Sequence, residues 1–277
     1  MSTEGSSTIG KERRSNYALQ AGSSDEFVAL LTDSLPARPE YFARDVELNR
    51  EGAPALDTLP HLEALPAADV RRLQSEGAIV LDTRPVMEFA VAHVPGAIHI
   101  ALTGQYASWA ARLLGLDQRF ILCGEDDEHI RESQLRLARV GIEKVLGYLD
   151  GGIVGWILGG NGAEYIPQIA VEDLRRMLVE EPDGVAILDV REPGETEVAA
   201  IPGSLRIPLS QIPARSSEID RSKLLVVHCK GGYRSSIATS LLRRAGVQDL
   251  ANLTGGFDAW AKANAAAPGD VSVQRAV

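Results

Sequence analysis

Short apolar runs alternate with helical patterns from about residue 61 to about residue 264. Val185–Leu188 and Leu224–Val227 are apolar runs bounded by polar residues, which is typical of buried strands. Over Val171–Glu181 the apolar residues recur at helical spacing and predict a helix. Strands that alternate with crossover helices predict an α/β fold with mainly parallel sheets.

The same pattern predicts the remaining elements. Strands are expected at Ala78–Leu81, Phe120–Leu122, Lys144–Leu149 and Leu250–Leu253, and helices at Val70–Gln74, Ile130–Arg139 and Ser235–Arg244.

The chain contains an internal repeat. Leu81-Asp82-Thr83-Arg84 matches Leu188-Asp189-Val190-Arg191 at an offset of 107 residues (189 − 82), and Pro95-Gly96 matches Pro202-Gly203 at the same offset (203 − 96). Two copies of one α/β domain are therefore expected, at 61–160 and 166–264, joined across the glycine-rich run 159–162.

The two ends of the chain fit neither copy. Residues 1–60 hold one amphipathic candidate helix, Asp25–Leu31, and too little apolar surface for a core of their own. Residues 265–277 are rich in Ala and are expected to be a disordered tail.

Composition narrows the class of protein. The 277 residues carry a net charge of −10 and no long basic run, so nucleic acid is not an expected partner. No stretch is apolar enough for a membrane span, and the N-terminus lacks the apolar segment of a secretory signal, so we expect a cytoplasmic protein. Two cysteines suit a reducing compartment, and five scattered histidines predict no metal site.

One of these cysteines lies where chemistry is expected. Cys229 follows a predicted buried strand and directly precedes Lys230-Gly231-Gly232-Tyr233-Arg234 and a helix. The carboxyl end of a parallel strand and the start of a helix are positions where anions bind, which favours the thiolate. Cys229 is therefore predicted to be a nucleophile.

The residues after Cys229 suit an anion. Glycines at 231 and 232 let a tight loop turn successive N–H groups towards one point. Lys230 and Arg234 are expected to add positive charge that orients an anionic donor and stabilises charge as a sulfur–sulfur bond breaks.

The motifs of the second copy, taken together, resemble a rhodanese. They are Asp189-Val190-Arg191, the Ile-Pro-Gly-Ser turn at 201–204, the Cys-x4-Arg loop and the closing Thr-Gly-Gly-Phe-x-x-Trp at 254–260. The resemblance implies a sulfurtransferase without a cofactor, in which Cys229 takes sulfane sulfur from thiosulfate or a small persulfide. Cys229 would then pass the sulfur to an acceptor such as sulfite, cyanide or a thiol.

Two other functions compete with this one. Phosphatases of related design use a Cys-x5-Arg loop, whereas only four residues separate Cys229 from Arg234 and form a smaller ring that suits sulfur. The main alternative is a non-enzymatic sulfur carrier or redox-sensing module that holds a persulfide on Cys229 for a protein partner.

The neighbours of the loop are given supporting roles. Asp189 and Arg191 are expected to hold the loop by a buried ion pair or hydrogen bonds, and Ser235 to lie at or near the helix N-cap. Tyr233 could wall the pocket or face solvent. His228 is expected to pack on the end of the sheet rather than act as a base.

The first copy is expected to be inactive. Ungapped alignment from Gly141 against Gly246 places Gly124 opposite Cys229 and His129 opposite Arg234, an offset of 105 (246 − 141). The loop that follows Cys123 is acidic, which disfavours a thiolate and repels an anionic donor. Cys123 is therefore expected to be a buried strand residue.

The N-terminal segment carries a second resemblance. The segment 6–19 (SSTIGKERRSNYAL), with Tyr41-Phe42 and Glu47-Leu48-Asn49-Arg50, resembles the end of the metallo-β-lactamase-fold domain in proteins that fuse a persulfide dioxygenase to two rhodanese domains. The metal-binding part of that domain is absent. The resemblance implies a relation to a persulfide dioxygenase or another sulfur-relay partner; a disordered leader is the other interpretation.

Overall fold

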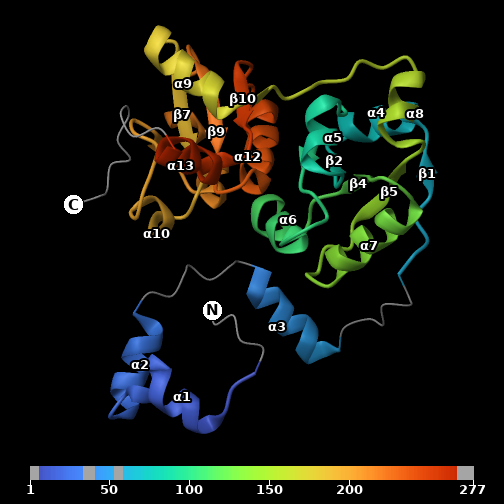
Figure 1. Ribbon diagram of the computed structural model, residues 1–277. Helices are drawn as coiled ribbons and strands as arrows, with labels where there is room; N and C mark the ends of the chain where they lie inside the picture. Colours follow the sequence, from blue (N-terminus) through green and yellow to red (C-terminus); the bar gives the residue numbers. More distant parts are fainter. Residues whose placement is uncertain (1–5, 34–40, 53–58, 267–277) are drawn as a thin grey trace.

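Two parallel five-stranded sheets form the centres of two domains (Figure 1). The computed structural model describes residues 6–33, 41–52 and 59–266. The first sheet has the strand order β1-β5-β4-β2-β3, and the second has the order β6-β10-β9-β7-β8. Each strand pairs in parallel with its neighbours, as expected for strands joined by crossover helices.

The elements of the first domain follow the repeat unit. They are β1 (Ala64–Leu65), α4 (Ala67–Ser75), β2 (Ile79–Asp82), α5 (Val86–Val91), β3 (Ile98–His99), α6 (Tyr106–Leu114), β4 (Phe120–Cys123), α7 (Asp127–Ala138), β5 (Val145–Leu149) and α8 (Gly152–Leu158).

The second domain repeats this order with additional short helices. It contains β6 (Gln168–Ile169), α9 (Val171–Glu180), β7 (Val185–Asp189), α10 (Pro193–Thr196), β8 (Leu205–Arg206), η3 (Leu209–Gln211), α11 (Ile212–Arg215), η4 (Ser216–Glu218), β9 (Leu224–His228), α12 (Tyr233–Arg244), β10 (Leu250–Leu253) and α13 (Gly256–Ala266).

The sequence predicted the central strands of both sheets and missed the two-residue edge strands. Strands β2, β4, β7 and β9 are buried along most of their length, so their apolar runs were visible in the sequence. Edge strands β3 and β8 are too short to show a period. The expected α/β class is confirmed.

Helices lie at both ends of the described chain, outside the two sheets. Helices α1 (Ile9–Ser15) and α2 (Ser24–Thr32) and the turn η1 (Tyr17–Gln20) bury no side chain, and α3 (Tyr41–Glu51) follows them. At the other end, α13 extends to Ala266, so residues 265 and 266 belong to a helix rather than to the expected tail, because alanine is the best helix former. The rest of that expected tail, 267–277, lies outside the described residues.

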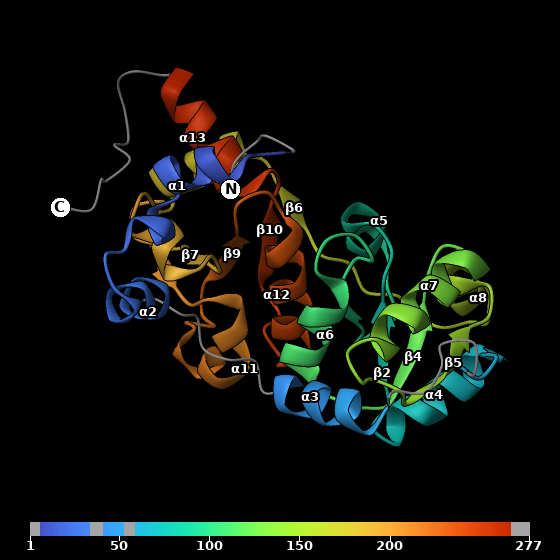
Figure 2. The same cartoon turned by 90° about the horizontal axis from the view of Figure 1, so that it is seen from below.

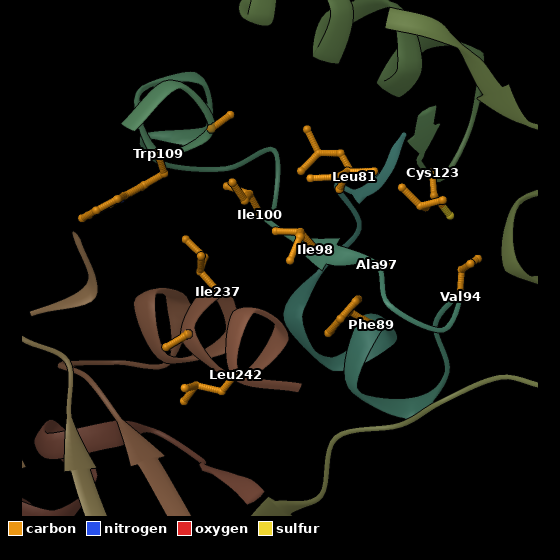
Figure 3. Close-up of a cluster of buried hydrophobic side chains, with 14 of the residues drawn as sticks. Leu81, Phe89, Val94, Ala97, Ile98, Ile100, Trp109, Cys123, Ile237 and Leu242 are labelled. Carbon is orange, nitrogen blue, oxygen red and sulfur yellow. The ribbon is translucent and has the colours of Figure 1, made fainter. Parts of the chain in front are cut away.

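Helix α12 lies between the two domains (Figures 1 and 2). One side of the helix packs on its own sheet at β9 and β10, and the other side packs on β3 of the first domain. One continuous apolar cluster therefore crosses the domain boundary. Ile237 of α12 points towards Ile98 and Ile100 of the first domain, and Leu242 lies on the other side of the helix (Figure 3). The linker between the domains does not separate two independent cores.

Candidate active site

Cys229 lies at the carboxyl end of β9, immediately before a short loop and α12. The backbone N–H of Gly232 donates to its Sγ atom, with a nitrogen-to-sulfur distance of 3.1 Å. Gly232 has a φ of +114° and is the N-cap of α12, a backbone conformation that residues other than glycine rarely adopt. Of the two glycines predicted to turn N–H groups towards one point, Gly232 directs its N–H at Cys229.

The N-terminus of α13 holds the loop from behind. The N–H groups of Phe257 and Asp258 donate to the carbonyls of Cys229 and Lys230, at 2.8 and 3.0 Å. A Cβ on Gly256 would lie 2.5 Å from the Cys229 carbonyl oxygen, so only glycine allows this approach. The loop carbonyls are fixed towards α13, which leaves the Gly232 N–H free to point at the sulfur.

Asp189 and Arg191 form the predicted buried ion pair. Arg191 Nη2 lies 2.6 Å from Asp189 Oδ2, and both side chains are almost fully buried. The guanidinium also lies over the ring of Phe257, 3.9 Å from the ring centroid. Because the Phe257 N–H binds the Cys229 carbonyl, this contact connects the ion pair to the loop.

Arg234 is paired with a residue that the sequence analysis did not select. Its Nη1 and Nη2 atoms donate to Oε2 and Oε1 of Glu195, at 2.5 and 2.8 Å. These hydrogen bonds lower the pKa of Glu195 and raise that of Arg234. The expected free cation is therefore largely neutralised by a carboxylate.

A sequence signal for Glu195 was available. The repeat offset of 107 places Glu195 opposite Glu88 (195 − 88), and each glutamate follows the arginine of the shared Asp-x-Arg motif by the same spacing. The signal was weak because the partner arginine lies 39 residues further along the chain. Only the fold brings the two side chains together.

The other predicted neighbours take defined positions. Ser235 lies within the first turn of α12 rather than at the cap, and its hydroxyl donates to the Gly232 carbonyl at 3.1 Å. Lys230 and Gly231 are exposed. Tyr233 is half-buried, and its hydroxyl donates to the carbonyl of Ala101 in the first domain, at 3.1 Å.

His228 packs on the end of the sheet, as expected. It is fully buried, and burial lowers its pKa. Its Nε2 atom lies 3.6 Å from Asp189 Oδ2, too far for a hydrogen bond. A neutral imidazole buried in this place is not positioned to act as a general base.

Strand pairing confirms how the two copies align. Asp82 is paired with Cys123 in β2 and β4, and Asp189 is paired with His228 in β7 and β9. Cys123 is therefore the counterpart of His228, and Gly124 is the counterpart of Cys229. Cys123 is fully buried in β4, and burial raises its pKa.

A cavity of about 390 Å³ in the first domain is lined in part by the loop that corresponds to the cysteine loop of the second domain. Acidic residues line it, namely Glu88, Glu125, Asp126, Asp127 and Asp150. Among the described residues, no group of three or more His, Cys, Asp or Glu side chains is arranged to hold a metal ion. No helix in the described parts of the chain is long and apolar enough to cross a membrane.

The fold and the site define a class: a tandem α/β protein with one cysteine in a glycine-rich loop between a strand and a helix. The model of the rhodanese-like domain family matches residues 66–158 and 170–263. The chain belongs to the rhodanese-like domain family, and it carries two copies of the domain.

Two sequence relatives each match a stretch of about one domain. A sulfurtransferase of Allochromatium vinosum is 36% identical over 97 residues, which are 35% of this chain and 90% of that protein. The uncharacterized protein YqhL of Bacillus subtilis is 42% identical over 74 residues, 27% of this chain and 59% of that protein.

A solved structure spans more of the chain. The thiosulfate sulfurtransferase of Pseudomonas aeruginosa is 25% identical and covers 73% of this chain and 43% of its own, with a TM-score of 0.34. Family membership and the sequence relatives indicate a role in sulfur transfer at the level of the family.

Proposed function

We propose that this protein is a sulfurtransferase that carries sulfane sulfur as a persulfide on Cys229. The observation that carries the proposal is the Gly232 N–H directed at Cys229 Sγ, at the start of a twelve-residue helix. An N–H group and a helix N-terminus stabilise negative charge on sulfur, whether it is a thiolate or the outer atom of a persulfide.

The reaction has two displacements. The Cys229 thiolate attacks the sulfane sulfur of the donor, a new sulfur–sulfur bond forms, and the donor's own sulfur–sulfur bond breaks. The leaving group, sulfite from thiosulfate or a thiolate from a persulfide, departs with the electron pair of that bond. An acceptor nucleophile such as a thiolate or sulfite then attacks the outer sulfur and releases the Cys229 thiolate.

Residues around the sulfur support each step. The Gly232 N–H stabilises charge on Cys229, and the Asp189–Arg191 pair holds the loop through Phe257. Arg234 is already bound to Glu195, so the positive charge for the donor is assigned to Lys230, which follows Cys229 directly in the sequence. Gly231, Tyr233 and Ser235 complete the loop and the first turn of α12.

Mass spectrometry of the intact protein tests the proposal. After exposure to thiosulfate or glutathione persulfide, we expect one added sulfur, about 32 Da, since covalent transfer requires one sulfur atom on the nucleophile. Cys229→Ser should lose both the adduct and turnover, and Cys123→Ser, which changes a buried strand residue, should keep both. Full turnover by Cys229→Ser would exclude the mechanism.

The same experiment separates an enzyme from a carrier. A sulfurtransferase should turn over repeatedly with small acceptors such as sulfite, cyanide or glutathione. A non-enzymatic carrier or redox sensor should accept one sulfur and then stop until its protein partner is added.

The setting of the reaction is also a proposal. Both cysteines are free, which suits the cytoplasm. The N-terminal segment resembles part of a persulfide dioxygenase, and its helices expose Ile9, Tyr17, Phe27 and Val28. We therefore propose a persulfide dioxygenase or a similar sulfur-relay protein as the partner, which co-purification of the full chain with such an enzyme would test.

A further inference from the structure

Helix α12 starts at the catalytic loop but is buried by both domains. Seven of its residues are buried: Ser235, Ser236, Ile237, Ala238, Thr239, Ser240 and Leu242. Four of these carry hydroxyl groups, which need hydrogen-bond partners when they are removed from water. Two of these hydroxyls, on Ser236 and Ser240, bond to His99, a residue of the first domain.

His99 is bound to α12 through its ring and its backbone. Its Nδ1 lies 2.7 Å from Ser236 Oγ, and its backbone N–H donates to Ser240 Oγ at 3.0 Å. Its Nε2 lies 2.9 Å from the carbonyl oxygen of Arg84. A carbonyl can only accept, so Nε2 carries the proton and Nδ1 accepts the proton of the Ser236 hydroxyl.

The His99 ring has little freedom to turn away from these partners. It is fully buried and stacks on Phe89, with 4.5 Å between the ring centroids. Both ring nitrogens are used, and the Arg84 carbonyl is part of the first domain's own loop after β2. The first domain thus presents a fixed acceptor to the first turns of α12.

Tyr233 makes the second contact between the loop and the first domain. Its hydroxyl donates to the Ala101 carbonyl, and its ring lies against Gly104, where an added Cβ would be 3.4 Å from the ring. Arg136 of α7 holds this segment by donating to the carbonyls of Leu102 and Gly104. The Tyr233 contact is therefore made to a braced segment of the first domain.

The repeat shows that these contacts are not required by the domain fold. The counterpart of His99 in the second domain is Arg206 (206 − 99 = 107), which is exposed at the edge of its sheet. The counterpart of Ser236 in the first domain is Arg131 (236 − 131 = 105), which is also exposed. The first copy therefore carries its contact residue, His99, on β3, and the second copy carries Ser236 on α12. The equivalent position in the other copy is in each case an exposed arginine.

We propose that the first domain is a positioning scaffold for the catalytic loop, and that Ser236 and Tyr233 are the positioning residues through which it acts. Three hydrogen bonds connect the first domain to the nucleophile: the Ser236 hydroxyl donates to His99 Nδ1, the Ser236 N–H donates to the Gly232 carbonyl, and the Gly232 N–H donates to Cys229 Sγ. The inactive copy thereby fixes where the Gly232 N–H points.

A matched pair of variants in the full chain tests this inference. Ser236→Ala and Ser240→Ala each remove one buried hydroxyl that bonds to His99, but only Ser236 lies in the turn that bonds to Gly232. We expect Ser236→Ala to shift the pH profile of Cys229 alkylation by iodoacetamide and to lower kcat about fivefold, as expected for loss of about 1 kcal/mol from one interior hydrogen bond. Ser240→Ala should lose a similar amount of thermal stability but keep the wild-type pH profile of alkylation and the wild-type kcat.

Tyr233→Phe provides a second measurement if Ser236→Ala folds poorly. It removes one oxygen atom and should shift the alkylation profile in the same direction, with kcat lowered more than KM is raised. Unchanged alkylation profiles in both Ser236→Ala and Tyr233→Phe, or equal shifts in Ser236→Ala and Ser240→Ala, would overturn the inference. Alkylation does not require sulfur transfer, so this result is independent of the proposed function, on which only the kcat measurement rests.

Discussion

The carboxylate of Glu195 occupies both terminal nitrogens of Arg234, the arginine that ends the catalytic loop. A guanidinium bound in this way cannot offer the same two donors to an incoming anion. The charge that the loop presents to a donor is consequently lower than the residues Lys230 and Arg234 suggest. Under the proposed function, this pair should therefore affect which sulfur donor the site prefers.

Glu195→Gln should strengthen the binding of thiosulfate. The substitution removes a negative charge and frees Arg234 to interact with the dianion, so we expect KM for thiosulfate to fall about fivefold, equivalent to about 1 kcal/mol. KM for a donor of low net charge, such as cysteine persulfide, should change little. Steady-state kinetics with both donors measure this.

Glu197→Gln is the control for that variant. Glu197 is an exposed residue at the end of the same short helix. Its substitution changes the net charge of the protein by the same amount as Glu195→Gln but leaves the partner of Arg234 in place. An equal fall in KM in both variants would show that net charge, rather than release of Arg234, is responsible.

Gly256→Ala should damage the active site by displacing the catalytic loop. The added methyl group would lie 2.5 Å from the Cys229 carbonyl and 2.7 Å from the Lys230 carbonyl, so the loop has to move. We expect a loss of at least about tenfold in kcat/KM, because small displacements of a nucleophile cost large factors in rate. Activity assays and thermal denaturation should be measured together.

Gly152→Ala separates backbone strain from displacement of the loop. Gly152 is the counterpart of Gly256 in the first domain (256 − 152 = 104) and has nearly the same φ, +55° against +56°. Its nearest neighbour for an added Cβ is at 3.5 Å, so only strain is introduced. This variant should lose about 1–2 kcal/mol of stability and keep its activity; a comparable loss of activity would contradict the explanation.

Stability should fall as the pH falls from about 6.5 to about 4. Burial lowers the pKa of His99 from 6.5 to about 4, so in this range the unfolded chain binds a proton that the folded protein excludes. The sign follows from linkage: the state that binds more protons gains as pH decreases, and here that is the unfolded state. His99 alone accounts for about 3 kcal/mol across this window.

Urea denaturation at several pH values measures this dependence. Burial also lowers the pKa of His93 and His228, which adds to the slope in the same direction. His99→Gln should therefore reduce the slope without abolishing it, whereas His61→Gln, at an exposed position, should leave it unchanged. An undiminished slope in His99→Gln would show that His99 is not the main group.

The interior strands and the place of Cys229 in the fold follow from the sequence itself. Buried parallel strands must be apolar on both faces, so β7 and β9 are visible as uninterrupted runs such as Ile187-Leu188 and Val226-Val227. The end of β9 then places Cys229 at a strand-to-helix junction, and the glycines after it indicate a tight loop. Alignment of the two repeats also predicts that the first copy has a glycine, Gly124, at the position of this cysteine.

The partners of the polar side chains required the tertiary structure. Glu195 and Arg234 are 39 residues apart, and His99 and Ser236 are 137 residues apart, so no local pattern joins them. A serine on a helix has the same sequence signature whether it faces water or another domain. Sequence periodicity determined which residues enter a core, because burial of apolar surface depends on local spacing. Which polar groups meet was decided by how the folded chain packs, because hydrogen bonds and ion pairs form only where both partners come within about 3 Å.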